Sequence, residues 1–359
     1  MAPGPDPALE ALLGIELPII QAPMAGANLS AMAIAVSEAG GLGSLPCAML
    51  SPDQVRREVQ TIRTATAKPF NLNFFCHTPP VPDRQREAAW LDRLRPYYRE
   101  FGLDANAPAG GPTRGAFDEA LCAVVEELRP PVVSFHFGLP PEPLLRRVKE
   151  TGAKVISSAT TVAEAAFLAE WCDAIIAQGL EAGGHRGMFL TGDLDTQLGT
   201  LALVPAIVDA VAVPVIAAGG LADARGIAAA LTLGAAGVQL GTAYLGCPES
   251  TISGLHRAAL AGSAPTAITN VITGRPARGI VNRLVREVGP ISPLAPSFPN
   301  ALPAILPLRA AAETRGSADF SPLWAGQAYP FSRALPAGAL TRQLMTGALS
   351  LLGGRRPAE

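Results

Sequence analysis

Short apolar runs alternate with longer segments of helical periodicity through the first 240 residues of the chain. Eight of the runs have strand-like composition, and several are apolar on both faces, which is typical of strands in a covered parallel sheet. They are residues 18–22, 41–45, 70–75, 132–137, 154–158, 173–177, 213–217 and 237–240. Between the runs, apolar positions recur at helical spacing and predict helices over residues 29–39, 52–65, 116–128, 141–150, 161–171, 200–211 and 223–233.

The last of these helices carries the clearest boundaries. Asp223 is a plausible N-cap, Ile227, Ala230 and Leu231 form an apolar stripe, and Gly234 is a plausible residue just past the end. Repeated alternation of strand and helix favours an α/β fold in which the strands close into a (β/α)₈ TIM barrel. A doubly wound open sheet is the alternative, because spacing alone does not show closure.

Two segments depart from the alternation. Residues 76–115 form an insertion after the third strand, with Trp90, Tyr97 and Tyr98 among many charges. Residues 263–359 follow the eighth unit and predict helices near 301–315 and 335–352. We expect residues 1–262 to form the barrel, with the insertion as a possible lid. We expect residues 263–359 to form a helical extension that packs on the barrel and covers its mouth.

Composition narrows the class of protein. Hydrophobic residues make up 49% of the chain and charged residues 16%, which predicts a soluble protein with a large core. The net charge of −2 gives no support for binding nucleic acid or a membrane surface. No apolar run reaches the length of about 20 residues that crosses a bilayer, and the first residues lack the pattern of a secretion signal. The cysteines are scattered, which fits reduced thiols. We therefore expect a cytoplasmic protein.

The segment from Gln178 to Gly187, QGLEAGGHRG, directly follows the sixth predicted strand. It places His185 and Arg186 on a glycine-rich loop at the carboxyl end of a strand, where barrels carry their chemistry. Because the chain has only 4 histidines, His185 has few competitors for a role in proton transfer.

Two later loops indicate an anion site. Residues 213–223 run from a strand into Gly219 and Gly220, and residues 237–242 repeat the arrangement one unit later. Loops after the seventh and eighth barrel strands commonly bind phosphate through backbone N–H groups and helix N-termini. Each such bond to a charged group contributes about 1.5–3 kcal/mol, so a few of them could hold a phosphorylated cofactor without a lysine. The alternative is that these glycines only form tight turns.

Several of these segments together carry a resemblance to one family. They are PIIQAPMAG (18–26), GGLGSL (40–45), NLNFF (71–75), AQGLEAGGHRG (177–187), VPVIAAGGLAD (213–223), GVQLGTAYL (237–245) and WAGQA (324–328). The chain resembles the nitronate monooxygenases, formerly called 2-nitropropane dioxygenases, which are FMN-dependent (β/α)₈ barrels. AQGLEAGGHRG is the most specific of the segments, whereas GGLG and AAGG alone would be weak signals.

The resemblance implies a function and a set of FMN contacts. The enzyme would oxidise alkyl nitronates with O₂ to carbonyl compounds and nitrite, and neutral nitroalkanes are a candidate second substrate. Pro23, Met24 and Ala25 would line the isoalloxazine ring, and Asn73 and Gln178 would bond its polar edge or the ribityl chain. The ribityl phosphate and nearby groups would be held by Gly183, Gly184, Ala218, Gly219, Gly220, Gln239, Leu240, Gly241 and Thr242.

His185 would then lie near the reactive edge of the flavin. A neutral imidazole, with an ordinary pKa near 6.5, can accept the proton on the carbon beside a nitro group, or can neutralise a nitronate that is already ionised. A loop histidine that caps backbone groups is the alternative. His136, Trp324 and Gln327 are candidate substrate contacts, although core packing is the alternative for the first two. Arg186 could contact the nitro oxygens or the phosphate, or be a solvated charge.

The remaining polar residues carry weaker predictions. Glu181 is expected to orient the loop, Ser134 to fill the core, and His77 and His256 to be surface or structural residues. No set of histidines, cysteines and carboxylates has the spacing of metal ligands, so we expect no metal site.

Three other functions stay open at this stage. An NAD(P)H-dependent flavin reductase of quinones or enoyl thioesters could use the same barrel. A phosphate-binding isomerase or lyase could use the same two loops, and a non-catalytic binding module is the third. The expected partners are a small nitronate or nitroalkane and O₂. A homodimer is possible, but no feature of the sequence settles the oligomeric state.

Overall fold

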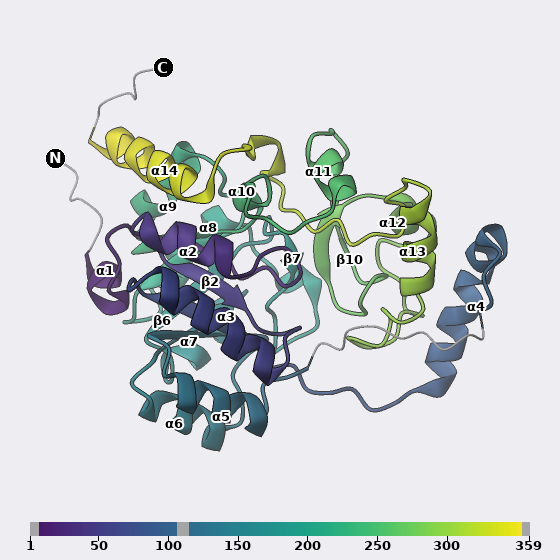
Figure 1. The fold of residues 1–359 in the computed structure, drawn as a ribbon, viewed down its shortest axis with the longest axis horizontal. Coiled ribbons are helices and arrows are strands. Elements are labelled where there is room, and N and C mark those ends of the chain that lie inside the picture. The colour runs from purple at the N-terminus through teal and green to yellow at the C-terminus, as the bar shows by residue number, and fades with distance from the viewer. Residues whose placement is uncertain (1–6, 106–114, 354–359) are drawn as a thin grey trace.

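In the computed structural model, which describes residues 7–105 and 115–353, eight parallel strands form one continuous sheet (Figure 1). The order around the sheet is β1-β9-β8-β6-β5-β4-β3-β2. A parallel bridge between Ile20 and Leu42 joins the two ends, and the Gln21 N–H donates to the Leu42 carbonyl at 2.9 Å. The predicted closed barrel is therefore confirmed, and the alternative of a doubly wound open sheet is wrong. The strands are β1 (Ile19–Gln21), β2 (Gly43–Pro46), β3 (Phe70–Phe75), β4 (Val132–His136), β5 (Lys154–Ala159), β6 (Ala174–Gln178), β8 (Val215–Ala218) and β9 (Gly237–Leu240).

The outer ring contains a helix from the far end of the chain. The consecutive helices are α2 (Ser30–Glu38), α3 (Pro52–Ala65), α5 (Glu119–Leu128), α6 (Glu142–Glu150), α7 (Val162–Ala169), α8 (Thr200–Val208) and α9 (Ala224–Thr232). The ring is completed by α14 (Ala337–Leu352), which packs against both α9 and α2 (Figure 1). The helix predicted over 335–352 exists, but it does not cover the mouth. Its apolar stripe, including Leu340, Leu344 and Ala348, is buried against the barrel instead.

The barrel interior is divided along its length by the two-residue alternation of the strands. Val132, Ile156 and Ile216 fill the amino-terminal half together with Leu9 and other apolar residues of one cluster. Leu9 belongs to α1 (Ala8–Leu13), which closes that end. Residues two apart on a strand share a face, so Ser134, Ser158 and Gln178 also point inward, two positions after Val132, Ile156 and Ile176. The carboxyl mouth is therefore the polar end of the barrel.

A separate lobe projects from the mouth, to the right in Figure 1. It contains α4 (Arg84–Phe101), α11 (Gly254–Leu260), β10 (Thr266–Thr269), β11 (Ala277–Ile280), α12 (Arg283–Val288) and α13 (Leu306–Thr314). The insertion helix α4 packs on the C-terminal part of this lobe: Trp90 Nε1 donates to the Ala301 carbonyl at 3.1 Å, and the Tyr98 hydroxyl donates to the Ala304 carbonyl at 2.8 Å. Residues 106–114 of the predicted insertion lie outside the described residues.

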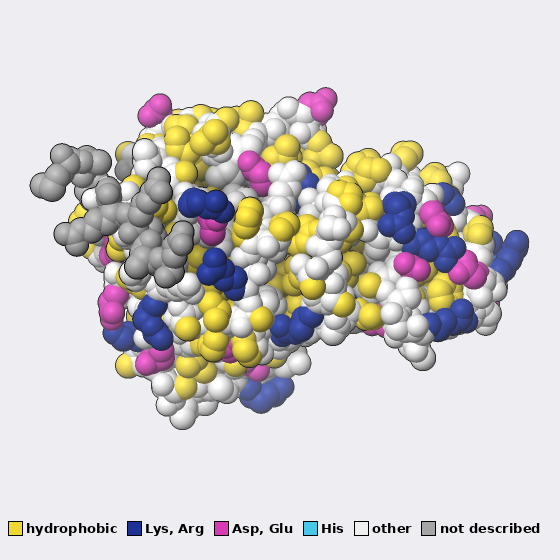
Figure 2. All heavy atoms as spheres, turned by 90° about the horizontal axis from the view of Figure 1, so that it is seen from above, with side chains coloured by type: hydrophobic (Ala, Val, Ile, Leu, Met, Phe, Trp, Pro, Cys, Tyr) yellow, Lys and Arg dark blue, Asp and Glu magenta, His cyan; other side chains and the backbone are white. Residues whose placement is uncertain are grey.

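The outer end of the lobe carries mixed charges, which Figure 2 shows as adjacent blue and magenta side chains. Arg283 pairs with Glu100 at 2.7 Å and with Glu287 at 3.0 Å, and this pairing ties α12 to the end of α4.

None of the helices in the described part of the chain is both long and apolar enough to span a membrane. The shorter elements are β7 (Gly184–His185), α10 (Thr242–Leu245) and the 3₁₀ turns η1 (Leu194–Thr196) and η2 (Tyr329–Phe331).

Candidate active site

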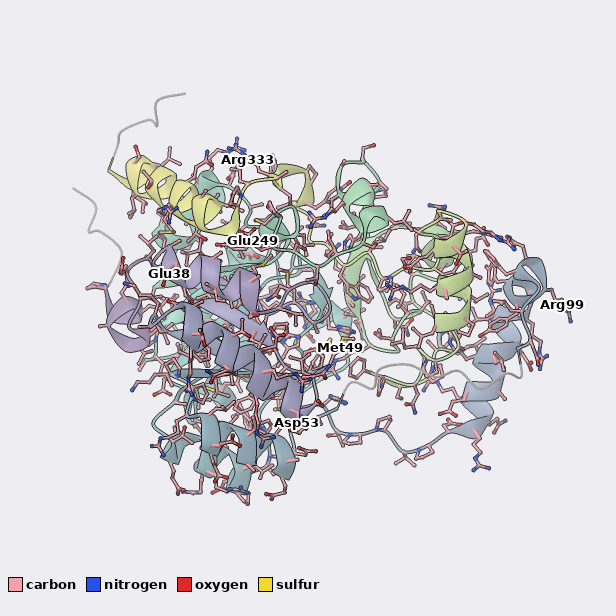
Figure 3. The ribbon with its side chains drawn as sticks, in the orientation of Figure 1. Glu38, Met49, Asp53, Arg99, Glu249 and Arg333 are labelled. Atoms are coloured by element: carbon pink, nitrogen blue, oxygen red, sulfur yellow. The ribbon has the colours of Figure 1, made fainter. Side chains whose placement is uncertain are left out.

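A cavity of about 420 Å³ opens at the carboxyl ends of the strands. This volume lies within the range of small-molecule sites. Figure 3 shows Met49, one of its lining residues, where the barrel faces the lobe, whereas Arg99 lies at the far end of α4. Of the insertion residues that the structure describes, none lines the cavity. The predicted site residues that line it are Pro23, Met24, Ala25, Asn73, His136, Gln178, Gly183, Gly184, His185, Ala218, Gly219, Gly220, Gln239, Gly241, Thr242 and Trp324.

Two predicted residues lie outside the cavity lining. On β9, Gln239 lines the cavity, whereas the next side chain, Leu240, is buried in the apolar layer between strands and helices. Strand alternation explains the difference, because neighbours along a strand point to opposite faces. The side chain of Gln327 is exposed, and its backbone N–H donates to the Glu181 carbonyl at 3.0 Å.

The imidazole of His185 is held among aromatic rings. His185 belongs to the two-residue strand β7, which pairs with β11 of the lobe, so part of the predicted loop is extended and fixed. Its Nε2 lies 2.9 Å from the hydroxyl of Thr273, which is fully buried. The ring centroids of Phe298 and Trp324 lie 5.2 and 5.4 Å away. Lobe residues thus make the nearest contacts to this side chain, and Phe75 and Phe137 of the barrel lie farther from it.

The backbone of His185 is clamped from the barrel side. Gln178 Nε2 donates to the His185 carbonyl at 3.0 Å, and Gln178 Oε1 accepts from the Gly187 N–H at 2.7 Å. His136 Nε2 lies 3.2 Å from the same carbonyl and its Nδ1 lies 2.6 Å from the Ser158 hydroxyl. Because a carbonyl only accepts, His136 carries its hydrogen on Nε2 and accepts from Ser158. Burial lowers the pKa of His136 to about 3, so the ring is neutral at pH 7.

Arg186 holds the loop together from within. Its side chain is fully buried, with Nη1 and Nη2 donating to the carbonyls of Gly179 and Gln178 at 2.7 Å each, and Nε donating to Gln197 at 3.1 Å. Burial lowers the pKa of Arg186 to about 10, which leaves it charged at pH 7. Interpreting it as a solvated charge is therefore wrong, and its donors bind the protein's own backbone.

The loop also makes backbone contact with the WAGQA segment. A Cβ on Gly183 would lie 2.4 Å from the Gly326 nitrogen, so only glycine fits there. The Gly326 N–H donates to the Thr242 hydroxyl at 2.9 Å. Glu181 accepts from the backbone N–H and the hydroxyl of Thr200, which confirms its predicted role in orienting the loop.

The loops after β8 and β9 offer donors to an anion. Gly219 and Gly220 have φ of +109° and +69°, a region that L side chains rarely adopt. The N–H groups of Gly220 and Gly241 donate to no backbone carbonyl among the described residues. Gln239 Oε1, next to them, is buried and has no hydrogen-bond partner within the described part of the chain. A buried acceptor of this kind indicates a missing donor.

Of the two helices that follow these loops, α9 has its N-terminus capped by a side chain. The Asp223 carboxylate caps α9 by accepting from the N–H groups of Arg225 and Gly226, each at 3.0 Å. The predicted N-cap is confirmed, but it places a negative charge where the anion was expected to gain from the helix. The N-terminus of α10, in contrast, has Gly241 as its N-cap residue and carries no side-chain cap.

Three residues in or beside the cavity were not predicted as site residues from the sequence. Ser158 shares the inward face of β5 with Ile156, so strand alternation could have identified it. His256 is buried and lines the cavity, which corrects its expected surface location but is compatible with a structural role. Thr273 had no signal, because 88 positions separate it from His185 in sequence.

Comparison with known proteins adds independent findings. The family model described as nitronate monooxygenase matches residues 6–347. A nitronate monooxygenase of Pseudomonas aeruginosa is 45% identical over 93% of this chain and 97% of its own length. The solved nitroalkane oxidase of Streptomyces ansochromogenes is 37% identical, with a TM-score of 0.87 over 97% of this chain and 99% of that chain. FabK from Thermotoga maritima is 28% identical, with a TM-score of 0.73 over 96% and 97%.

Proposed function

The chain belongs to the nitronate monooxygenase family, and we propose that it binds FMN and uses O₂ to oxidise alkyl nitronates, and nitroalkanes after their deprotonation, to carbonyl compounds and nitrite. The chain is an enzyme, and the names of its relatives indicate that it oxidises nitronates or nitroalkanes. The cofactor FMN, the role of His185 as the base and the identity of the products are what we propose.

The residues around the cavity fit FMN. The N–H groups of Gly220 and Gly241 suit the phosphate, because neither serves a backbone carbonyl of the described chain. Gln239 Oε1 suits a donor on the ribityl chain or the ring, since it is buried and unpaired among the described residues. Met24 and Ala25 would line the flavin ring. Gln178 supports the loop around His185 through two side-chain hydrogen bonds. This role is compatible with a further contact to FMN.

The position of His185 carries the proposal for the substrate. Its imidazole lies in the cavity and is oriented by Thr273. A neutral imidazole would accept the proton from the carbon beside the nitro group, and the resulting charge would balance the anionic nitronate. Phe298 and Trp324 exclude water from one side of the ring, which strengthens the attraction between the two charges. When bound, FMN would supply the redox chemistry, and the protein positions the substrate and holds the proton.

An absorption spectrum of the purified protein and a titration of the apoprotein with FMN test the cofactor. An oxygen electrode with propyl nitronate tests the reaction. We expect a flavin spectrum and oxygen uptake that depends on the nitronate. A protein that binds no FMN would refute the proposal. Rapid anaerobic bleaching of the flavin by NADH, without nitronate-dependent oxygen uptake, would instead favour the NAD(P)H-dependent reductase.

A further inference from the structure

A second cavity, of about 690 Å³, opens near the mouth of the barrel. It is lined by the loops that follow β3 and β4, by helices α6 and α7, and by Arg275 of the lobe. It shares no lining residue with the cavity that contains His185. The proposed reaction uses none of the residues that line it.

Phe137 forms part of the wall between the two cavities. Its ring centroid lies 6.0 Å from that of His185, which lines the first cavity, and 4.0 Å from Cζ of Arg275, which lines the second. The backbone of Phe137 has a φ of +72°, a left-handed conformation that is rare for a bulky residue. Strained backbone of this kind is concentrated at ligand sites.

Arg275 brings a positive charge without an ion-pair partner to the second cavity. Its guanidinium donates to the Met188 carbonyl, but it forms no ion pair with a carboxylate of the described residues. Its Nε is buried without a hydrogen-bond partner in the same part of the chain. Burial lowers the pKa of Arg275 to about 10, so the group is charged at pH 7. A partly buried cation of this kind favours an anion that enters the cavity.

The acidic residues around this cavity do not neutralise Arg275. Glu164 attracts it without pairing with it, and the carboxylate of Glu164 is fully buried and accepts from three backbone N–H groups. Glu142 lines the cavity but accepts from Arg146 Nε at 2.8 Å, and Glu170 is exposed to solvent. The charge of Arg275 is therefore left for a ligand.

His77 adds a second group without a partner. Its side chain is 7% exposed, so it is not a surface residue, and its Nδ1 is buried without a hydrogen-bond partner among the described residues. Burial and the charge of Arg275 lower the pKa of His77 to about 4, so the ring is neutral at pH 7. A neutral imidazole can carry its hydrogen on either nitrogen, so Nδ1 can donate to an oxygen atom. His77 and Arg275 both contact the ring of Phe137, which suits one anion that has two oxygens.

Much of the remaining wall is aromatic. Trp171 and Phe189 line the cavity, and Phe167 beside them is 45% exposed. A flat apolar group would cover these rings. We propose that the second cavity binds a small aromatic carboxylate, with its anionic group at Arg275 and His77 and its ring among the aromatic side chains. The inference does not rest on the proposed function, because it requires neither FMN nor the base.

Calorimetric titrations of the wild-type protein with benzoate, benzamide and acetate test the site. Benzamide has the shape of benzoate without its charge, and acetate has the charge without the ring. Benzoate should bind roughly tenfold more tightly than either of them. Failure of benzoate to bind, or an affinity for benzamide or acetate equal to that for benzoate, would overturn the proposal.

Three variants place the ligand. Arg275→Gln should weaken benzoate binding about tenfold. Arg315→Gln is the matched control, because Arg315 Cζ also lies over a phenylalanine ring, that of Phe101 at 4.5 Å, but lines neither cavity. His185→Asn changes the first cavity and should leave the affinity for benzoate as in the wild type. Wild-type affinity in Arg275→Gln, or loss of binding in His185→Asn, contradicts the assignment.

Tryptophan fluorescence gives a second measurement that does not depend on the folding of Arg275→Gln. Trp171 lines the second cavity, whereas Trp324 lines the first. Benzoate should change the emission of the wild type and of Trp324→Phe, and this change should be absent in Trp171→Phe. A change that persists in Trp171→Phe and disappears in Trp324→Phe would place benzoate in the first cavity and refute the second site.

Discussion

Replacing Thr273 with valine tests whether the lobe positions the proposed base. Valine preserves the branched shape of threonine but removes the hydroxyl that lies 2.9 Å from His185 Nε2. Thr273 is fully buried, so water cannot readily replace the lost group. Leaving a buried polar atom without its partner costs about 1–3 kcal/mol. If this cost appears in the transition state for proton transfer, kcat/KM for neutral nitroethane falls about fivefold to 150-fold.

The assay compares neutral nitroethane with preformed ethyl nitronate by oxygen uptake. Only the neutral substrate requires proton removal, so the ratio of the two kcat/KM values should fall in Thr273→Val. Thr273→Ser keeps the hydroxyl and should retain most of the wild-type ratio. If valine lowers both activities equally, or changes neither, Thr273 does not act through the base.

Three further predictions concern the base, the loop and acid stability. His185→Asn should abolish turnover of neutral nitroethane and spare part of the oxygen uptake with ethyl nitronate; wild-type activity on nitroethane would remove His185 from the mechanism. Gly183→Ala places a Cβ 2.4 Å from the Gly326 nitrogen and should destabilise the fold by about 1–3 kcal/mol in thermal unfolding. Gly192→Ala, with nothing within 4 Å, is the matched control, and equal losses would contradict the clash. Burial holds the pKa below its usual value, at about 4, 3 and 4, in His77, His136 and His256. The unfolded chain therefore binds more protons between about pH 6.5 and pH 4, and stability should fall by up to about 1.4 kcal/mol per pH unit for each histidine as pH drops through this window. Equal urea midpoints at pH 7 and pH 5 would contradict the burial of these rings.

The strands of the barrel could be predicted because each one carries its signal locally. The run predicted over 70–75 matches β3 in full, and the run over 237–240 matches β9. Closure depends on contact between β1 and β2, which no local pattern encodes. The place of α14 was equally hidden: its apolar stripe shows that one face is buried, but not that the face fills the gap between α9 and α2.

In the lobe, the sequence pattern indicates the buried face of helix α4 but does not indicate strands β10 and β11. Trp90, Leu94, Tyr97 and Tyr98 are buried at the i, i+4, i+7 and i+8 positions of α4, which is the spacing of one helix face. Pro96, inside the same helix, obscured the pattern. Strands β10 and β11 are four residues each, and their register follows from pairing with each other and with β7. Such short strands have too few positions to show an alternation.

The site shows why a sequence can place residues at the mouth without assigning their roles. Strand alternation puts His136 and Gln178 on the inward face, but their bonds to the His185 carbonyl make both of them supports for the proposed base. The groups nearest the imidazole, Thr273, Phe298 and Trp324, come from beyond residue 262. The barrel residues Phe75 and Phe137 lie somewhat farther away, with ring centroids 6.4 and 6.0 Å from that of His185. The barrel therefore supplies the proposed cofactor site and the support of the proposed base, and the lobe supplies the nearest neighbours of its imidazole.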